Sequence, residues 1–386
     1  MSEKINIEGS EMPPKTKIDL TRSETYLHDN TEFLQFLPPN SIDCSITDEP
    51  YGINFMGKGW DRLPTADQWK ELLRVLKPGA WNLVICSPRQ DVMGETINRL
   101  KEAGFNVGFS SIYWTYAEGA AKVQSLEKRL GDEYHGCYPG MPLKPAVEVV
   151  LVTMKPLSED AYYKQAEQNR KGMVHVGPTR IPWREGETPS VGGRHFHSMT
   201  FGGQKEGGWK PRNTRETKKV AYGKTSLFRS ATYNDNPTED AGEYEINPDG
   251  RFPANLLVSN EILGDFSRFY DLSAWFEREL HRLPPDIRKQ FPFLYVRKPT
   301  RKEKQKHGLN NHETVKPLEL MVYLIQLTTD PGDIVLDIFN GSGTTTVAAK
   351  MCDRIGIGCE AQPEYHAIAA SRMHKTRIHK RLDGFL

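Results

Sequence analysis

Short apolar runs alternate with amphipathic segments along most of the chain. Apolar, β-branched runs are typical of buried parallel strands, and apolar residues at helical spacing indicate helices that cover a sheet. The predicted strands are 25–29, 42–47, 81–86, 109–116, 146–154, 293–296, 334–336 and 355–358. The predicted helices are 30–36, capped by Asn30 or Thr31, and 66–76, 91–103, 272–280, 318–328, 344–350 and 372–381. This alternation predicts a doubly wound α/β fold with helices on both faces of the sheet.

The pattern of apolar runs stops between Leu157 and Asp249, where glycine, proline and charged residues dominate. We therefore expect a polar tail at 1–20, a core domain formed by 21–156 and 250–386, and an irregular insertion at 157–249. A chain of 386 residues is long enough for this division.

The middle of this insertion is strongly basic. Between Arg170 and Arg229 it carries thirteen Lys or Arg against four Glu, with Trp, Phe and Tyr residues between them. Cations with interspersed aromatic rings are typical of a nucleic-acid contact surface. A solvated insertion without a role in recognition is the alternative.

The composition adds three exclusions. The five cysteines are scattered and form no C-x-x-C, which argues against a disulfide framework and a structural zinc. His195 and His197 have no cysteine or carboxylate cluster beside them, so we expect no metal site. The first fifteen residues are polar and no apolar stretch is long enough to cross a bilayer, so we expect a soluble, cytoplasmic protein without a membrane partner. The sequence does not indicate an oligomeric state.

The most informative stretch is 331–360, which predicts strand, glycine turn, helix and second strand. The first strand ends at Asp337, the turn is Phe339-Asn340-Gly341-Ser342-Gly343, and the second strand ends at Glu360. Glycines allow the backbone to approach a bound molecule, and the start of the helix offers unpaired N–H groups. An acidic residue about 20 positions downstream suits a ribose diol. The stretch therefore predicts a site for an adenosine-containing cofactor, with a tight structural turn as the alternative.

Two common nucleotide motifs do not fit this turn. A dinucleotide site would show a third glycine where Thr344, Thr345 and Thr346 stand, and a Walker loop would need Gly-Lys-Ser/Thr.

A second candidate site follows the predicted strand 42–47. Asp48-Glu49-Pro50-Tyr51 comes directly after this strand, and ligand chemistry in open α/β sheets lies beyond the carboxyl ends of strands. An ordinary turn is the alternative reading, since Asp and Pro both favour turns. Cys86 ends the predicted strand 81–86 and is expected to be a small core residue.

Several tracts together resemble the N6-adenine/N4-cytosine DNA methyltransferase family, in the permuted order that puts the catalytic tract before the cofactor loop. D-E-P-Y is similar to the family's D-P-P-Y, F-N-G-S-G-T-T to its S-adenosylmethionine loop, and H-E-T-V-K-P at 312–317 to its H-P-T-V-K-P tract. G-R-F-P-A-N at 250–255 resembles the G-R-W-P-A-N of phage-type members. The resemblance implies a Rossmann-like fold with a mostly parallel, seven-stranded sheet that contains one antiparallel strand.

The resemblance also implies an activity and residue roles. The activity is methyl transfer from S-adenosylmethionine to the exocyclic N6 of adenine in double-stranded DNA, on a flipped base and in the context of restriction–modification, with cytosine N4 as the alternative target. In the catalytic tract, the Asp48 carboxylate and the Glu49 carbonyl accept hydrogen bonds from the target amine, Pro50 follows, and Tyr51 stacks on the base. The implied cofactor residues are Asp29 at the adenine, Thr314 and Lys316 at the carboxylate end, Glu360 at the ribose, and Asp337, Phe339, Gly341, Ser342, Gly343 and Thr344 in the loop.

Two positions depart from the family's pattern. Glu49 and Glu313 replace prolines. They leave open a protein that binds DNA or cofactor but has lost catalysis.

Overall fold

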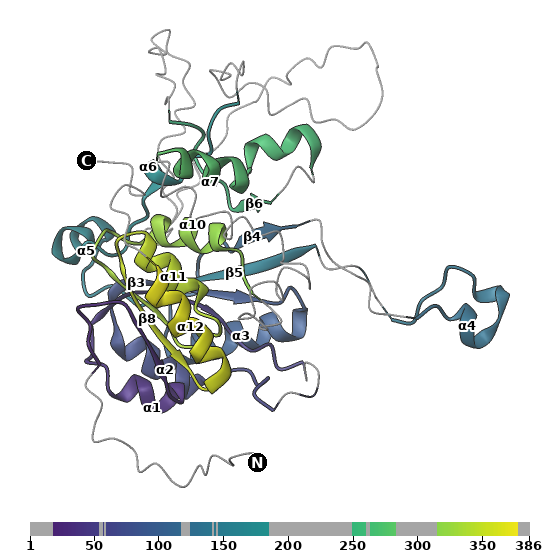
Figure 1. Ribbon diagram of the computed structural model, residues 1–386, viewed down its shortest axis with the longest axis horizontal. Coiled ribbons are helices and arrows are strands. Elements are labelled where there is room, and N and C mark those ends of the chain that lie inside the picture. The colour runs from purple at the N-terminus through teal and green to yellow at the C-terminus, as the bar shows by residue number, and fades with distance from the viewer. Residues whose placement is uncertain are drawn as a thin grey trace, which may run out of the picture. The chain divides into compact units, whose positions relative to one another are not determined.

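An eight-stranded sheet forms the centre of the part of the chain that the structure describes (Figure 1). The computed structural model describes residues 18–53, 57, 59–116, 124–140, 143, 146–184, 249–259, 263–282 and 315–376. The strands are β1 (Glu24–Leu27), β2 (Ile42–Asp48), β3 (Leu76–Cys86), β4 (Ile112–Thr115), β5 (Val147–Met154), β6 (Leu256–Val258), β7 (Ile334–Asp337) and β8 (Ile355–Glu360). Their order across the sheet is β1-β8-β7-β2-β3-β5-β4-β6.

The sheet is mixed and mostly parallel, as the sequence indicates. β5 runs antiparallel to both of its neighbours, β3 and β4, and every other neighbouring pair is parallel. The expected number of seven strands is wrong, because the short β6 adds an eighth by pairing in parallel with β4 at Tyr113 and Leu256. The predicted strand 293–296 lies outside the described residues.

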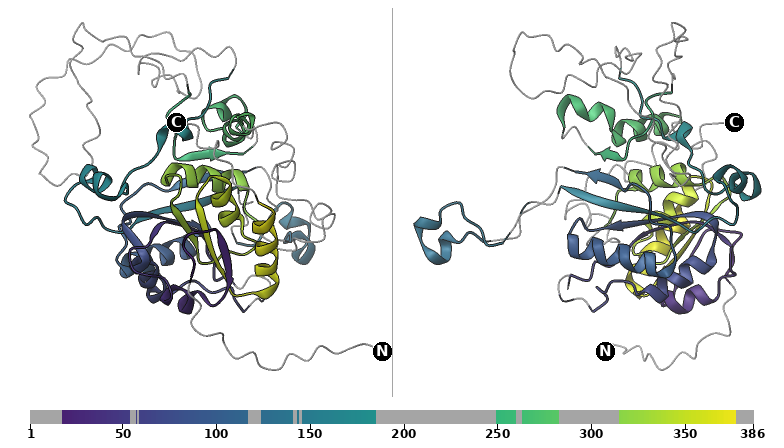
Figure 2. Two further views of the ribbon diagram at one scale, coloured as in Figure 1. Left: turned by 60° about the vertical axis from the view of Figure 1, so that its left-hand side comes forward. Right: turned by 180° about the vertical axis from the view of Figure 1, so that it is seen from behind.

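Helices cover both faces of this sheet (Figure 2). One face packs against α7 (Leu272–His281), α10 (Leu318–Thr328) and α11 (Thr344–Met351), and the other against α1 (Asn30–Gln35), α2 (Ala66–Val75) and α3 (Gln90–Ala103). Side chains of β3 contribute to the apolar core on both faces of the sheet. Leu83 and Ile85 pack in the core beside α7, α10 and α11, and Val84 and Cys86 pack in the core beside α1, α2 and α3. Successive side chains of a strand point to opposite faces, so a strand buried on both sides is apolar throughout.

The remaining helices are α4 (Glu127–Leu130), α5 (Tyr162–Asn169), α6 (Val176–Thr179) and α12 (Pro363–Lys375), and there are two short 3₁₀ segments, Asp132–Tyr134 and Gly264–Phe269. Residues 372–375 of the predicted helix 372–381 form the end of the longer helix α12, and residues 377–381 lie outside the described part of the chain. The cap of α1 is Asp29, not Asn30 or Thr31, because its carboxylate accepts from the backbone N–H of Thr31 at 2.9 Å. None of the described helices is long and apolar enough to span a membrane.

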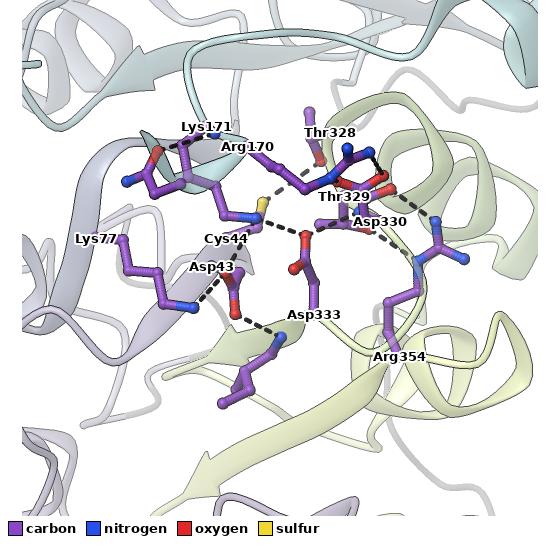
Figure 3. Close-up of polar contacts among 12 residues, drawn as sticks. Asp43, Cys44, Lys77, Arg170, Lys171, Thr328, Thr329, Asp330, Asp333 and Arg354 are labelled. Carbon is purple, nitrogen blue, oxygen red and sulfur yellow. Dashed lines mark hydrogen bonds and ion pairs between the residues drawn. The ribbon is translucent and has the colours of Figure 1, made fainter. Parts of the chain in front are cut away.

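The first part of the expected insertion packs against the core. The chain divides into one unit of Met1–Trp183 with Asp249–Leu386 and a second of Arg184–Pro248, so residues 157–183 of the expected insertion group with the core unit. Figure 3 shows the reason: Lys171 lies between Asp43 on β2 and Asp333 before β7, with N–O distances of 3.0 and 2.7 Å. Burial alone would lower the pKa of Lys171, but these two carboxylates raise it, so the lysine is a buried cation.

Candidate active site at the carboxyl ends of two adjacent strands

The two candidate motifs lie side by side. β2 and β7 are parallel neighbours, paired at Cys44 with Val335 and at Ser45 with Leu336, so Asp48 and Asp337 end at the same edge of the sheet. The Thr47 hydroxyl joins the two strand ends by donating to Asp337 Oδ1 at 3.0 Å. Both strand ends open into one cavity of about 1800 Å³. The strand order therefore brings together two tracts that almost the whole core domain separates in the sequence.

This cavity contains most of the residues that the sequence suggests. All four residues of the catalytic tract line it, as do the described candidate cofactor residues with the exception of Gly343: Asp29, Lys316, Asp337, Phe339, Gly341, Ser342, Thr344 and Glu360. Thr314 and Glu313 lie outside the described residues.

The glycine turn has a backbone that side chains would disturb. Gly341 and Gly343 have φ angles of +50° and +81°, which L-residues rarely adopt. A Cβ at Gly343 would also lie 2.9 Å from the Cβ of Ala369 on α12, so this glycine allows the turn to pack closely against that helix. The turn is held from outside by Arg372, whose guanidinium donates to the carbonyl and hydroxyl of Ser342 and to the hydroxyl of Thr344.

Carboxylates surround the turn on the cavity side. Glu360 Oε2 accepts from the Gly341 N–H at 2.8 Å, and its Oε1 accepts from the Gln362 N–H at 2.8 Å. Burial raises the pKa of Asp337 to about 7, against hydrogen bonds that favour its ionised form. Asp29 lines the same cavity. A group with a positive charge and a diol, such as S-adenosylmethionine, fits this donor set, because a cation offsets the desolvation of Asp337 and carboxylates accept from hydroxyls.

The catalytic tract carries a buried ion network. Lys316 Nζ donates to Asp48 Oδ2 at 2.6 Å and lies 3.4 Å from Glu148 Oε2 on β5, and the Tyr51 hydroxyl donates to Asp48 Oδ1 at 3.3 Å. Burial alone would lower the pKa of Lys316, but Asp48 and Glu148 hold it well above its ordinary value. Burial raises the pKa of Asp48, and the ammonium of Lys316 opposes this. The ammonium of Lys316, 2.6 Å from the carboxylate, favours the ionised form of Asp48.

Lys316 has a partner that the resemblance does not imply. The resemblance puts this lysine at the carboxylate end of a cofactor, which stays a prediction, and in the structure its ammonium is paired with the candidate catalytic carboxylate of Asp48. Its aliphatic stem also brings Nζ to 5.8 Å from the centre of the Tyr51 ring. Lys316 therefore links the described end of the H-E-T-V-K-P tract to the D-E-P-Y tract.

Sequence reasoning missed three residues of the cavity wall. Trp114 on β4, Tyr116 after it and Glu148 on β5 line the cavity on the side of the catalytic tract. The rings of Trp114 and Tyr116 lie 4.8 Å apart. The signal for Glu148 was present, since it is the single acidic residue in the apolar run 146–154, where a carboxylate is costly unless it is paired.

Cys86 is a core residue, as expected. It is fully buried at the end of β3, and burial raises the pKa of its thiol to about 12. A thiol with this pKa supplies almost no thiolate at neutral pH, so it is unsuited to nucleophilic attack on a base.

Comparisons with known proteins agree with this site. The segments that match curated proteins are short: 46% identity over 54 residues to the type II methyltransferase M1.MboII of Moraxella bovis, and 40% over 71 residues to M.PvuII of Proteus hauseri. They cover 14% and 18% of this chain and 21% of each relative, so the match spans about a fifth of those proteins.

Among solved structures, the cytosine-N4-specific PvuII DNA methyltransferase aligns over 91% of this chain and 86% of its own, with 17% identity and a TM-score of 0.46. The M1.HpyAVI–SAM complex aligns over 91% and 99%, with 17% identity and a TM-score of 0.41. A family model described as DNA methylase matches residues 42–371, which is most of the chain, and the chain therefore belongs to the N6/N4 DNA methylase family.

Proposed function

We propose that this protein transfers a methyl group from S-adenosylmethionine to an exocyclic amine of a base in DNA, with adenine N6 as the target. The observation that carries the proposal is the shared cavity of Asp48 and the glycine turn. A methyl donor held at the turn and an amine held at Asp48 would lie at the same edge of the sheet. Direct transfer from donor to nitrogen requires such proximity and no covalent enzyme intermediate.

The residues around Asp48 suit the activation of an aromatic amine. The lone pair of such an amine is delocalised into the ring, so acceptors that hold its N–H bonds make the nitrogen a better nucleophile. An ionised Asp48 is an acceptor, and Lys316 favours the ionised form. The backbone carbonyl of Glu49 is the proposed second acceptor. Tyr51, Trp114 and Tyr116 offer aromatic surfaces for the base.

The methyl donor would be held by the opposite side of the cavity. The proposed contacts are Glu360 at the ribose, Asp29 at the adenine, Thr314 near the carboxylate end, and Asp337, Phe339 and Gly341 to Thr344 along the turn. When bound, this cofactor supplies an electrophilic methyl group on a positively charged sulfur. Buried carboxylates beside that charge contribute to its binding.

Two features support DNA as the substrate. The family is a DNA methylase family. The expected insertion is basic between Arg170 and Arg229, with thirteen Lys or Arg against four Glu, and we propose that the part of the insertion beyond Trp183 contacts the DNA and recognises the target sequence. A base inside a duplex cannot reach a cavity in a protein, so the target base would be extruded from the helix.

The alternative in which catalysis has been lost rests on Glu49 and Glu313, which replace prolines of the family's pattern, and Glu313 lies outside the described residues. In support of catalysis, the Glu49 carboxyl is turned toward α3, where it is 3% exposed and accepts from Thr96 at 2.7 Å.

The test is methyl transfer by the purified chain. Radiolabelled S-adenosylmethionine is incubated with unmethylated genomic DNA, with Asp48→Ala as the inactive variant and Asp160→Ala, at an exposed surface carboxylate, as the matched control. We expect label in DNA from the wild type and from Asp160→Ala, and none from Asp48→Ala.

Digestion of the labelled DNA to nucleosides identifies the target. N6-methyladenine supports the proposal, and N4-methylcytosine would replace adenine by cytosine without changing the reaction. If the wild type binds the cofactor and DNA but labels no DNA, the methyltransferase proposal is wrong and a binding protein is the better description.

A further inference from the structure

The side chain of Glu49 is buried beneath the catalytic turn (48–52). Glu49 Oε1 accepts from the hydroxyl of Thr96, which is 1% exposed on α3, at 2.7 Å. Glu49 Oε2 is buried and has no hydrogen-bond partner among the described residues. Glu49 also lines the cavity, and its backbone carbonyl is the proposed second acceptor for the target amine.

Among the described residues, no counter-charge is in contact with this carboxyl. Asp48 on β2 is a like charge, and the thiol of Cys86 at the end of β3 is neutral. Arg99 on α3 is attractive, but its guanidinium is bound to Glu95 and to the carbonyls of Leu63 and Pro64. Burial, the largest effect, raises the pKa of Glu49 to about 8. The carboxyl is therefore mostly neutral at pH 7, which avoids a buried charge without a contacting counter-ion among the described residues.

The hydrogen bond between Glu49 and Thr96 restrains the catalytic turn. Both side chains are buried, so water does not compete for this bond, and the bond ties the side chain of Glu49 to α3. Farther along the turn, the N–H of Gly52 donates to Asp61 Oδ1 at 2.8 Å. The Glu49–Thr96 bond restrains the side chain of the residue whose carbonyl would accept from the amine. Proline, which restricts a backbone through its ring, is absent from position 49.

We propose that Glu49 is a positioning residue: its neutral carboxyl, bonded to Thr96, holds the catalytic turn against α3 and aims the Glu49 carbonyl at the target amine. The inference rests on the proposed methyl transfer. Ionisation of Glu49 places a negative charge beside Asp48 in a buried region where no described residue provides a contacting cation, so the turn loosens as the pH rises past the point where Glu49 ionises. Methyl transfer then declines on the alkaline side of neutrality.

The experiment compares kcat and KM for cofactor and DNA, from about pH 6 to about pH 9.5, for five variants and the wild type. Glu49→Gln keeps a neutral acceptor for Thr96, whereas Glu49→Ala removes the bond from one side. Thr96→Val removes it from the other side, and Thr96→Ser keeps the hydroxyl. Thr179→Val is the matched control, because it deletes a buried hydroxyl on α6 that donates to the carbonyl of His175.

We expect a loss of kcat without a comparable change in the cofactor KM. Glu49→Ala and Thr96→Val should lower kcat by about 10- to 100-fold, the cost of a misplaced catalytic group. Glu49→Gln and Thr96→Ser should stay within about threefold of the wild type at pH 7, since each retains the bond. The alkaline decline of the wild type should be absent in Glu49→Gln, because an amide does not ionise. Thr179→Val should keep the kcat of the wild type.

Two outcomes would overturn the inference: Glu49→Gln as inactive as Glu49→Ala, or Thr96→Val as active as the wild type. Hydrogen exchange at the Gly52 amide tests the inference separately from activity. The protection of this amide should fall at least about tenfold in Glu49→Ala at pH 7. If the wild type is inactive but Glu49→Ala still loses protection at Gly52, methyl transfer is refuted and the structural role of Glu49 remains. If the protection of Gly52 does not change in Glu49→Ala, the positioning role itself is refuted.

Discussion

Lys316→Met is the most informative single change, because it removes the one cation in contact with the proposed catalytic carboxylate among the described residues. The side chain of Lys316 is 10% exposed and that of Asp48 is 23% exposed, so solvent screens their 2.6 Å ion pair only weakly. Methionine keeps most of the length of the side chain. The substitution leaves Asp48 and Glu148 as two carboxylates without the ammonium between them.

The size of the effect follows from this geometry. Two opposite unit charges 2.6 Å apart attract by about 6 kcal/mol at an effective dielectric constant of about 20, and desolvation of the ammonium offsets part of this. A close opposite charge shifts the pKa of a carboxyl by about 1–3 units, or about 1.4–4 kcal/mol. Burial already raises the pKa of Asp48 and Lys316 opposes it, so loss of Lys316 raises this pKa further. If the reaction requires ionised Asp48, the acid side of the rate profile must move to higher pH by the same amount.

The assay is the pH dependence of kcat at saturating cofactor and DNA. The acid limb of Lys316→Met should lie about 1–3 pH units above that of the wild type, with recovery of the rate at higher pH. Lys316→Arg, which keeps the charge, and Lys70→Met, at an exposed lysine on α2, are the controls. An acid limb that does not move would refute the assignment of Asp48 as an ionised acceptor supported by Lys316. Cofactor affinity, measured in the same variants by calorimetry, tests whether Lys316 also contacts the cofactor's carboxylate.

Three further predictions concern the scaffold around the site. Lys171→Met leaves Asp43 and Asp333, both drawn in Figure 3, without the cation that they share. The free energy of unfolding in urea should fall by about 3–5 kcal/mol, whereas an unchanged urea midpoint would contradict a buried ion pair. Gly358→Ala puts a Cβ 2.4 to 2.7 Å from atoms of the Asn340 side chain and should weaken cofactor binding by about tenfold or more. Gly94→Ala on α3 is the control, because its Cβ would meet no described atom within 4 Å, and it should leave binding unchanged. Arg372→Met removes three hydrogen bonds to Ser342 and Thr344 at the glycine turn and should weaken cofactor binding by about tenfold in calorimetry. Arg372→Lys should lose less affinity. Equal affinity in the wild type and both variants would show that the turn does not need this support.

The sequence by itself determined the order of the elements and the location of the site. Apolar runs fixed β2, β3, β5, β7 and β8 to within a few residues, because a strand buried on both faces must be apolar throughout. The position of Asp48 and Asp337 at strand ends was also readable, since the carboxyl ends of parallel strands meet at one edge of a sheet. The eighth strand, β6, could not be read in this way, because three residues with one parallel neighbour carry too short a pattern.

The tertiary structure decided which charged groups meet. Lys316 and Asp48 are 268 residues apart in the sequence, and their bond depends on how α10 and β2 pack. Glu49 could have pointed into the cavity or into the core, and only the placement of Thr96 on α3 selects the core. Local patterns specify which face of an element is buried, but they do not specify which polar side chains come into contact once several elements pack. For this reason the sequence could predict where the reaction site lies, and only the structure could identify the groups that set its electrostatics.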